Sequence, residues 1–189
     1  MFMKWAMAEI YPEHLLHIDK ARTAIVRGFA APCENSAKEP DYQILCQRHD
    51  TMPSLVIECG DSESMLKLQV DKNVWQQGSR GSVRVVIFVK YYSEDVNNQM
   101  KVDMEIWRTG QPVESISLFP DPTVPNPPKT LGLVGLDLPA EGPHLVLDDL
   151  YGGQCPPGVN GSTQLPLDLH FLRCKINKWA SEAGVFLIP

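Results

Sequence analysis

Long hydrophobic runs are absent from this chain of 189 residues, although 43% of its residues are hydrophobic. No stretch of about 18 apolar residues occurs, so the sequence predicts no membrane-spanning segment and no membrane partner. The opening residues, from Met1 to Glu9, reach an acidic side chain before the apolar part of a secretion signal is complete. We therefore expect a protein that is not secreted and that resides in the cytoplasm or the nucleus.

An excess of positive charge is also absent. The chain has 17 lysines and arginines against 23 aspartates and glutamates, which gives a formal net charge of −6. Proteins that hold nucleic acid mainly through its phosphates usually have a basic surface. The overall charge therefore argues against tight, non-specific binding of nucleic acid, whereas clustered acids neutralised by a metal ion remain compatible with phosphate chemistry.

Paired cysteine motifs are missing as well. The chain has five cysteines, an odd number, and no two of them are separated by two residues. Without a secretion signal, such a set indicates reduced thiols rather than a disulfide framework.

Proline is scarce in the first part of the chain and dense in the second, because twelve of the 16 prolines follow residue 110. High proline density excludes helices and central strands. We therefore expect a folded core over 1–110 and a proline-rich, irregular extension over 111–189 that packs on it. Within the extension, Phe171–Trp179 predicts a short terminal helix.

The spacing of apolar residues predicts the elements of the core. In order, they are a helix over 11–27, strands over 41–46 and 53–59, a helix over 64–77, and strands over 83–89 and 101–107. The polar turn at 47–51 predicts antiparallel pairing of the first two strands. The strand–helix–strand segment that follows predicts a parallel βαβ unit, with the nearly continuous apolar run of 83–89 in the centre of the sheet. The expected fold class is α/β or α+β, with a mixed sheet and flanking helices.

The helix over 64–77 is expected to turn its apolar side chains towards the sheet. These side chains are Met65, Leu66, Val70, Val74 and Trp75. Gly78 is expected to end the helix.

Asp41 and Glu58 stand out as candidate metal ligands. Asp41 opens the first strand, and Glu58 lies within the apolar run of the second. If these strands are adjacent, the two carboxylates converge at one end of the sheet, where Mg²⁺ or Mn²⁺ would find oxygen ligands on rigid elements. The alternative is that Glu58 pairs with an arginine or a lysine, or accepts a backbone hydrogen bond, since a buried charge needs a partner. The neighbouring Cys59 is expected to face the other side of the strand as a buried thiol.

Four segments in a fixed order carry a resemblance to a known family: Pro40-Asp41, Pro53–Ser64, Leu68–Trp75 and Val83–Lys90. Their residues and spacing resemble the restriction-endonuclease-like, or PD-(D/E)xK, fold. More narrowly, they are similar to a set of small fungal proteins of that fold and to a large bacterial family of nucleases. The resemblance covers residues 36–110, with a weaker match at Leu145–Leu150.

The resemblance implies a metal-dependent phosphodiesterase core. Asp41 would match the first acid of the family motif and Glu58 the second, both as metal ligands, and Glu58 would also be catalytic. The chain departs from the pattern at Gly60, which stands where the family has its lysine. Either the site is rearranged, with Lys67, one helical turn before Asp71, as the catalytic amine, or the site is lost. The alternative is that Lys67 only pairs with a neighbouring acid on a solvated helix face.

Three classes of function stay open on the sequence. The first is metal-dependent hydrolysis of phosphodiester bonds in nucleic acid, with Mg²⁺ or Mn²⁺ as the cofactor. The second is a protein that has kept the fold as a non-catalytic binding module. The third is a scaffold reused for a small-molecule substrate, such as a cyclase or an isomerase of a fungal specialised-metabolism pathway. A homodimer is compatible with each.

Overall fold

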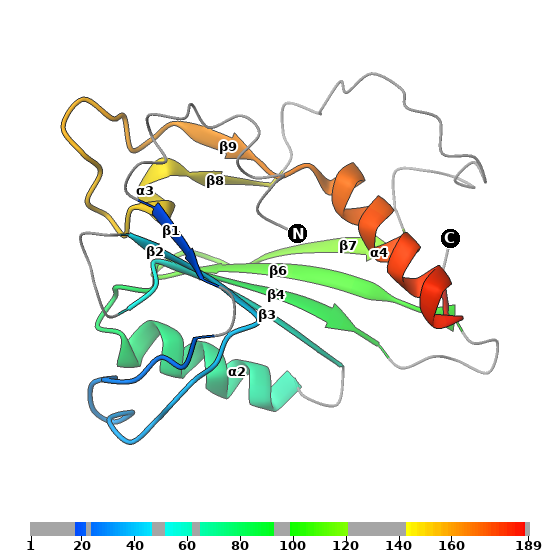
Figure 1. Ribbon diagram of the computed structural model, residues 1–189, viewed down its shortest axis with the longest axis horizontal. Coiled ribbons are helices and arrows are strands. Elements are labelled where there is room, and N and C mark those ends of the chain that lie inside the picture. The colour runs from blue at the N-terminus through cyan, green and yellow to red at the C-terminus, as the bar shows by residue number, and fades with distance from the viewer. Residues whose placement is uncertain are drawn as a thin grey trace.

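The computed structural model describes residues 18–21, 24–46, 52–61, 65–92, 99–120 and 143–187. At its centre, five strands form a mixed sheet with a helix on one face and C-terminal elements on the other (Figure 1). In sheet order, the strands are β2 (Tyr42–Cys46), β3 (Leu55–Asp61), β4 (Val85–Tyr91), β6 (Val102–Arg108) and β7 (Glu114–Phe119). The short strand β1 (Ile18–Ala21) extends the sheet beside β2. The expected mixed sheet with flanking helices is confirmed as an α+β arrangement.

The pairing of the strands follows the connections between them. Strands β2 and β3 are antiparallel, whereas β3 and β4 are parallel and have a helix between them in the chain. Strand β4 lies between β3 and β6, and all of its residues from Val85 to Lys90 are buried. A strand that is covered on both faces is apolar along most of its length. The predicted central position of this strand and its parallel pairing with β3 are both confirmed.

Helix α2 (Met65–Asn73) covers one face of the sheet and continues as a π-helical turn, η3 (Val74–Gly78) (Figure 1). The helical segment ends at Gly78, as predicted. A β-carbon at Gly78 would lie 3.0 Å from Cβ of Cys33 and 3.1 Å from the ring of Phe29, so this tight contact favours a glycine.

Val74 and Trp75 are buried as predicted, the side chains of Met65 and Leu66 lie outside the described part of the structure, and one position of α2 differs from the prediction. Val70 was expected to face the core, but it is 59% exposed. The side of the helical segment that meets the sheet includes Leu68, Asp71, Lys72 and Trp75, with the spacing i, i+3, i+4 and i+7, and Val74 is buried beside them. Two of these four residues, Asp71 and Lys72, are charged, and each has a partner that makes its position beside the sheet favourable. Asp71 pairs with Lys38, and Lys72 lies over the ring of Trp107. Tertiary contacts therefore override the apolar pattern.

The opposite face of the sheet is covered by the C-terminal part of the chain (Figure 1). Its elements are β8 (His144–Val146), α3 (Leu147–Leu150), β9 (Gln164–Pro166), α4 (Leu169–Ala183) and β10 (Phe186–Leu187), which pairs with β5 (Gln99–Met100). Leu147, Leu172 and Ile176 join the apolar core of the sheet. The predicted terminal helix is present as α4 and is longer than expected, with 15 residues.

The sheet continues past residue 110, where we expected the folded core to end. Strand β7 pairs with β6 and belongs to the main sheet. The segment Leu145–Leu150 contains both the end of a strand and a helical turn. Within the described ranges, no helix combines the length and the apolar character needed to cross a membrane.

The described part of the predicted helix over 11–27 is not helical. Residues Ile18–Ala21 form strand β1, and Val26 forms an antiparallel bridge with Lys38 through two backbone hydrogen bonds. The apolar spacing resembled that of a helix. Pairing with β2 and with Lys38 instead satisfies the backbone groups, and Val26 is buried in the core beneath α2. Residues 11–17 and 22–23 lie outside the described part of the chain.

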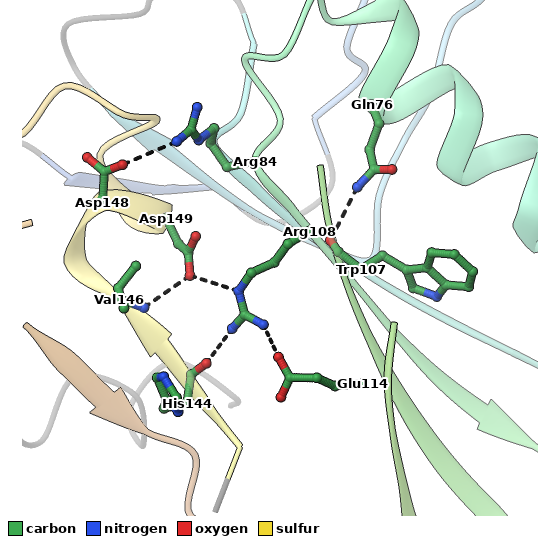
Figure 2. Close-up of polar contacts among 9 residues, drawn as sticks. All are labelled: Gln76, Arg84, Trp107, Arg108, Glu114, His144, Val146, Asp148 and Asp149. Atoms are coloured by element: carbon green, nitrogen blue, oxygen red, sulfur yellow. Dashed lines mark hydrogen bonds and ion pairs between the residues drawn. The ribbon is translucent and has the colours of Figure 1, made fainter. Parts of the chain in front are cut away.

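A polar network ties the C-terminal layer to the end of the sheet (Figure 2). Arg108, the last residue of β6, pairs with Glu114 and with Asp149 and donates to the carbonyl oxygen of His144. Asp149 Oδ2 lies 3.3 Å from Arg108 Nε and also accepts from the backbone N–H of Val146. The side chains of Arg108 and Asp149 are only 12% and 10% exposed. This largely buried pair therefore fixes β8 and α3 against the sheet.

Candidate functional site

Asp41 and Glu58 come from neighbouring strands at one end of the sheet. Asp41 directly precedes β2, and its Oδ2 accepts a 2.7 Å hydrogen bond from the backbone N–H of Cys59 on β3. The register pairs Tyr42 with Ile57, so Asp41 comes level with Glu58. The backbone of Asp41 also hydrogen-bonds the carboxylate of Glu58. The two strands therefore hold the two acids side by side.

The environment of Glu58 favours its protonated form. Burial raises its pKa to about 7, and the negative charges of Asp41 and Asp71 act in the same direction. The indole N–H of Trp75 donates a 2.8 Å hydrogen bond to Glu58 Oε1 and opposes them, because it stabilises the carboxylate. Near neutral pH, Glu58 therefore exchanges between its acid and base forms, as a general acid or base must.

Lys38 is a cation of this site that the sequence analysis missed. Its side chain forms an ion pair with Asp71 on α2, and its backbone is held by the bridge to Val26. The pair joins the segment before β2 to the helix that covers Glu58. The one signal in the sequence was the position of Lys38 two residues before Pro40-Asp41.

Lys67, the predicted catalytic amine, lies on α2 one turn before Asp71 and is exposed. Asp71 takes Lys38 as its partner, and among the described residues no ion pair involves Lys67. Its amine is therefore not engaged by the described acids, and its catalytic role stays a prediction.

A second charged cluster lies on the same face of the sheet as Glu58. Lys90 on β4 is 2% exposed, and its Nζ lies 2.5 Å from Oε1 of Glu105 on β6. The indole N–H of Trp107 donates a 2.8 Å hydrogen bond to the other oxygen of Glu105, and Lys72 of α2 lies 4.3 Å from the centroid of that ring. Since a buried ammonium group needs a partner, the amine of Lys90 is committed to Glu105.

The position of the missing lysine lies between these two clusters. Gly60 on β3 is paired with Lys90 on the neighbouring strand β4, so a lysine lies beside this position, although on the next strand. Cys59, which we expected to be buried, is exposed. The reason is that β3 continues past Ile57, its last residue paired with β2, so this end of the strand has less cover.

The described residues contain no group of three or more histidine, cysteine, aspartate or glutamate side chains arranged to hold a metal ion. A cation at Asp41 and Glu58 would have two protein carboxylates and would complete its coordination with water or substrate. Mg²⁺ is commonly bound in this way, because it gives up its water reluctantly.

Comparison with known proteins adds no assignment. No family model matches the chain, and no match was found among curated proteins or solved structures. The relation to the restriction-endonuclease-like fold therefore stays a prediction from the four sequence segments.

Proposed function

We propose that this chain is a metal-dependent phosphodiester hydrolase with its centre at Asp41 and Glu58. The observation that carries the proposal is the pairing of these two acids beside β3, where burial and the charges of Asp41 and Asp71 raise the pKa of Glu58 to about 7. Such an arrangement is costly for the protein alone. A divalent cation would relieve it, because a nearby positive charge favours the ionised form of both carboxylates.

Mg²⁺ or Mn²⁺ is the cation that these ligands fit. Both ions prefer carboxylate oxygens, and Mg²⁺ typically uses one or two carboxylates together with water and substrate phosphates. Asp41 and Glu58 supply that number, and the N–H of Cys59 orients the carboxylate of Asp41. When bound, such a cation would polarise a phosphate oxygen and lower the pKa of a water molecule.

Lys67 is the amine that we propose for stabilising charge on the phosphate. Lys38 and Lys90 are already engaged by Asp71 and Glu105. Lys67 is exposed on α2, and its long side chain can follow a phosphate group that approaches the helix. Substitution of Lys67 should therefore affect turnover more than cation binding.

The proposal is tested by cation binding and by cleavage measured on the same variants. Binding of Mn²⁺ and Mg²⁺ is followed by calorimetry at neutral pH, and cleavage is assayed on single- and double-stranded DNA and RNA. We expect Glu58→Gln to lose both binding and cleavage, and Lys67→Met to keep binding and lose most of the cleavage. Glu182→Gln, an exposed position on α4, is the matched control and should behave like the wild type. A wild-type chain that cleaves none of these substrates with either cation contradicts the proposal.

The pKa of Glu58 also favours a second candidate, acid–base catalysis on a small molecule. A carboxyl group with a pKa of about 7 can accept and return a proton at neutral pH without a metal. Turnover of a small molecule that survives a chelator but is lost in Glu58→Gln would support this function. A chain that binds no cation and turns over no substrate would instead fit the non-catalytic binding module.

A further inference from the structure

A cavity lies at the end of the sheet opposite to the centre of the proposed hydrolase. Its volume is about 170 Å³. Two of the residues that line it are Ser54, which directly precedes β3, and Ser82, which lies in the turn before β4. Glu58, in contrast, does not line the cavity and lies further along β3. The cavity is therefore separate from the Asp41–Glu58 site and is not explained by that function.

The chemistry of the lining is that of an anion site. Arg80 is the one charged side chain among the described residues that line the cavity, and Ser82 and Gln154 add polar groups. The hydroxyl of Ser54 is already used, since it donates a 2.6 Å hydrogen bond to the carbonyl oxygen of Leu150. Within the described ranges, no carboxylate pairs with Arg80. The described lining therefore carries one positive charge and no negative charge.

The backbone at Arg80 is strained in a way that favours a ligand-binding role. Arg80 has φ of 55° and Gly81 has φ of 82°, and the N–H of Ser82 donates to the carbonyl oxygen of Ser79 at 3.2 Å. Two consecutive left-handed residues closed by this hydrogen bond form a type I′ turn, whose first central position favours asparagine, aspartate or glycine. Strain of this kind concentrates at ligand clamps. Here it holds the arginine at the wall of the cavity.

A second tight turn contributes to the lining of the cavity. Gly152, which lines the cavity, and Gly153 have φ of 63° and 83°. Gly153 lets the chain pass the guanidinium of Arg84, which would lie 3.3 Å from a β-carbon at this position. Arg84 in turn pairs with Asp148 at 3.2 Å and points towards it (Figure 2). Asp148 is thus paired with Arg84, and within the described ranges no acid is paired with Arg80.

We propose that this cavity binds a compact oxyanion, the carboxylate or phosphate group of a small ligand. The guanidinium of Arg80 would form the charged hydrogen bonds, and Ser82 and Gln154 would donate to the remaining oxygens. A volume of about 170 Å³ suits a small metabolite rather than a polymer. The proposal does not depend on the hydrolase activity.

Inorganic phosphate and acetate are the probes, titrated separately into the full chain. Binding is followed by calorimetry and by the amide NMR shifts of Gly81, Ser82 and Gly152. We expect saturable shifts at these amides and binding that weakens about tenfold or more in Arg80→Gly, the loss expected for a charge-assisted hydrogen bond. Because glycine suits the left-handed turn, this variant should unfold at the same temperature as the wild type or higher. Tighter binding of phosphate identifies a phosphorylated ligand, and tighter binding of acetate a carboxylic acid.

Arg27→Gln is the matched control, since Arg27 is exposed and does not line the cavity. It should bind both probes like the wild type. Three outcomes would overturn the proposal: no saturable shifts in the wild type, equal affinity in Arg80→Gly, or an equal loss in Arg27→Gln, which would indicate a non-specific charge effect.

Discussion

Glu58 brings opposing electrostatic effects together in one side chain. Burial, Asp41 and Asp71 all favour its neutral form, whereas the indole N–H of Trp75 and the backbone of Asp41 favour the carboxylate. The balance leaves the pKa near neutrality, so a change in one partner should shift the protonation of Glu58 measurably.

The raised pKa of Glu58 predicts a pH-dependent effect of Glu58→Gln on stability. The pKa of Glu58 is about 7 in the folded chain, against an ordinary value of 4.5. Between pH 4.5 and about pH 7, Glu58 therefore keeps a proton in the folded chain that it has released in the unfolded chain. Stability from this group is therefore complete below pH 4.5 and is lost as the pH rises towards 7. We expect Glu58→Gln to resemble the wild type at low pH and to be more stable by about 1–3 kcal/mol above neutrality, with allowance for solvent screening. Urea unfolding at both ends of this range measures the difference, and an unchanged difference across the range would contradict the raised pKa.

Trp75→Phe should raise the pKa of Glu58 above its present value of about 7. The substitution keeps an aromatic ring in the core but removes the N–H that stabilises the carboxylate. We expect a loss of about 1–3 kcal/mol in the free energy of unfolding above neutral pH. Carbon-detected NMR titration of the glutamate carboxyl groups measures the pKa directly. Trp107→Phe removes a matched hydrogen bond to Glu105 and should leave the titration of Glu58 unchanged.

At the scale of elements, the helical segment that starts with α2 has both apolar and charged residues on the side that faces the sheet. Leu68 and Trp75 pack in the core, while Asp71 and Lys72 between them make an ion pair and a cation–π contact. The helix is thereby placed over Glu58 and brings both Asp71 and Trp75 to it. The charged residues of α2 thus set the electrostatics of the candidate site as well as the position of the helix.

The orientation of α2 predicts different costs for two neighbouring alanine substitutions. Leu68→Ala should lower the free energy of unfolding by about 2–5 kcal/mol, because Leu68 is 6% exposed and its removal leaves a cavity. Val70→Ala should change it by less than about 0.5 kcal/mol, since Val70 faces solvent and alanine favours helix. Denaturant unfolding of the two variants compares them. Equal costs, or a larger cost at Val70, would mean that the helix presents its other side to the sheet.

At the scale of the whole molecule, the C-terminal layer is held to the sheet by apolar packing and by the buried pair of Arg108 and Asp149. Arg108 binds groups from β7, β8 and α3 at once (Figure 2). The Arg84–Asp148 pair joins the same two layers but is much more exposed. The two pairs therefore make the same connection in different dielectric surroundings.

Arg108→Met should destabilise the chain by about 3–5 kcal/mol, because it leaves the buried carboxylate of Asp149 without its cation. Arg84→Met is the matched control and should cost about 0–1 kcal/mol, as expected for an exposed pair. Thermal and urea unfolding measure both variants. Partial recovery in the double variant Arg108→Met/Asp149→Leu would show that the cost comes from the unpaired charge, and an Arg108→Met variant as stable as the control would refute this account.

Local sequence patterns were sufficient for the elements whose apolar periodicity agrees with their final contacts. The run that forms β4 predicted a buried central strand, and the helix between β3 and β4 predicted their parallel pairing. The strand of Asp41 and the strand of Glu58 were predicted to be antiparallel neighbours, so both acids could be named from the sequence. These features depend on residues that are close in the chain or on one periodic segment.

The sequence by itself therefore determined the order of the main elements, the mixed sheet and the two acids beside β3. Only the tertiary structure decided which cations meet which acids: Lys38 reaches Asp71 across 33 positions of the chain, and Arg108 reaches Asp149 across 41. It also decided that residues 18–21 form a strand, because their backbone groups pair with β2. The physical reason is the same in each case. The spacing of apolar residues indicates which side of a helix or strand is buried. The formation of ion pairs and the pairing of edge strands depend on partners far away in the sequence, which only folding brings together.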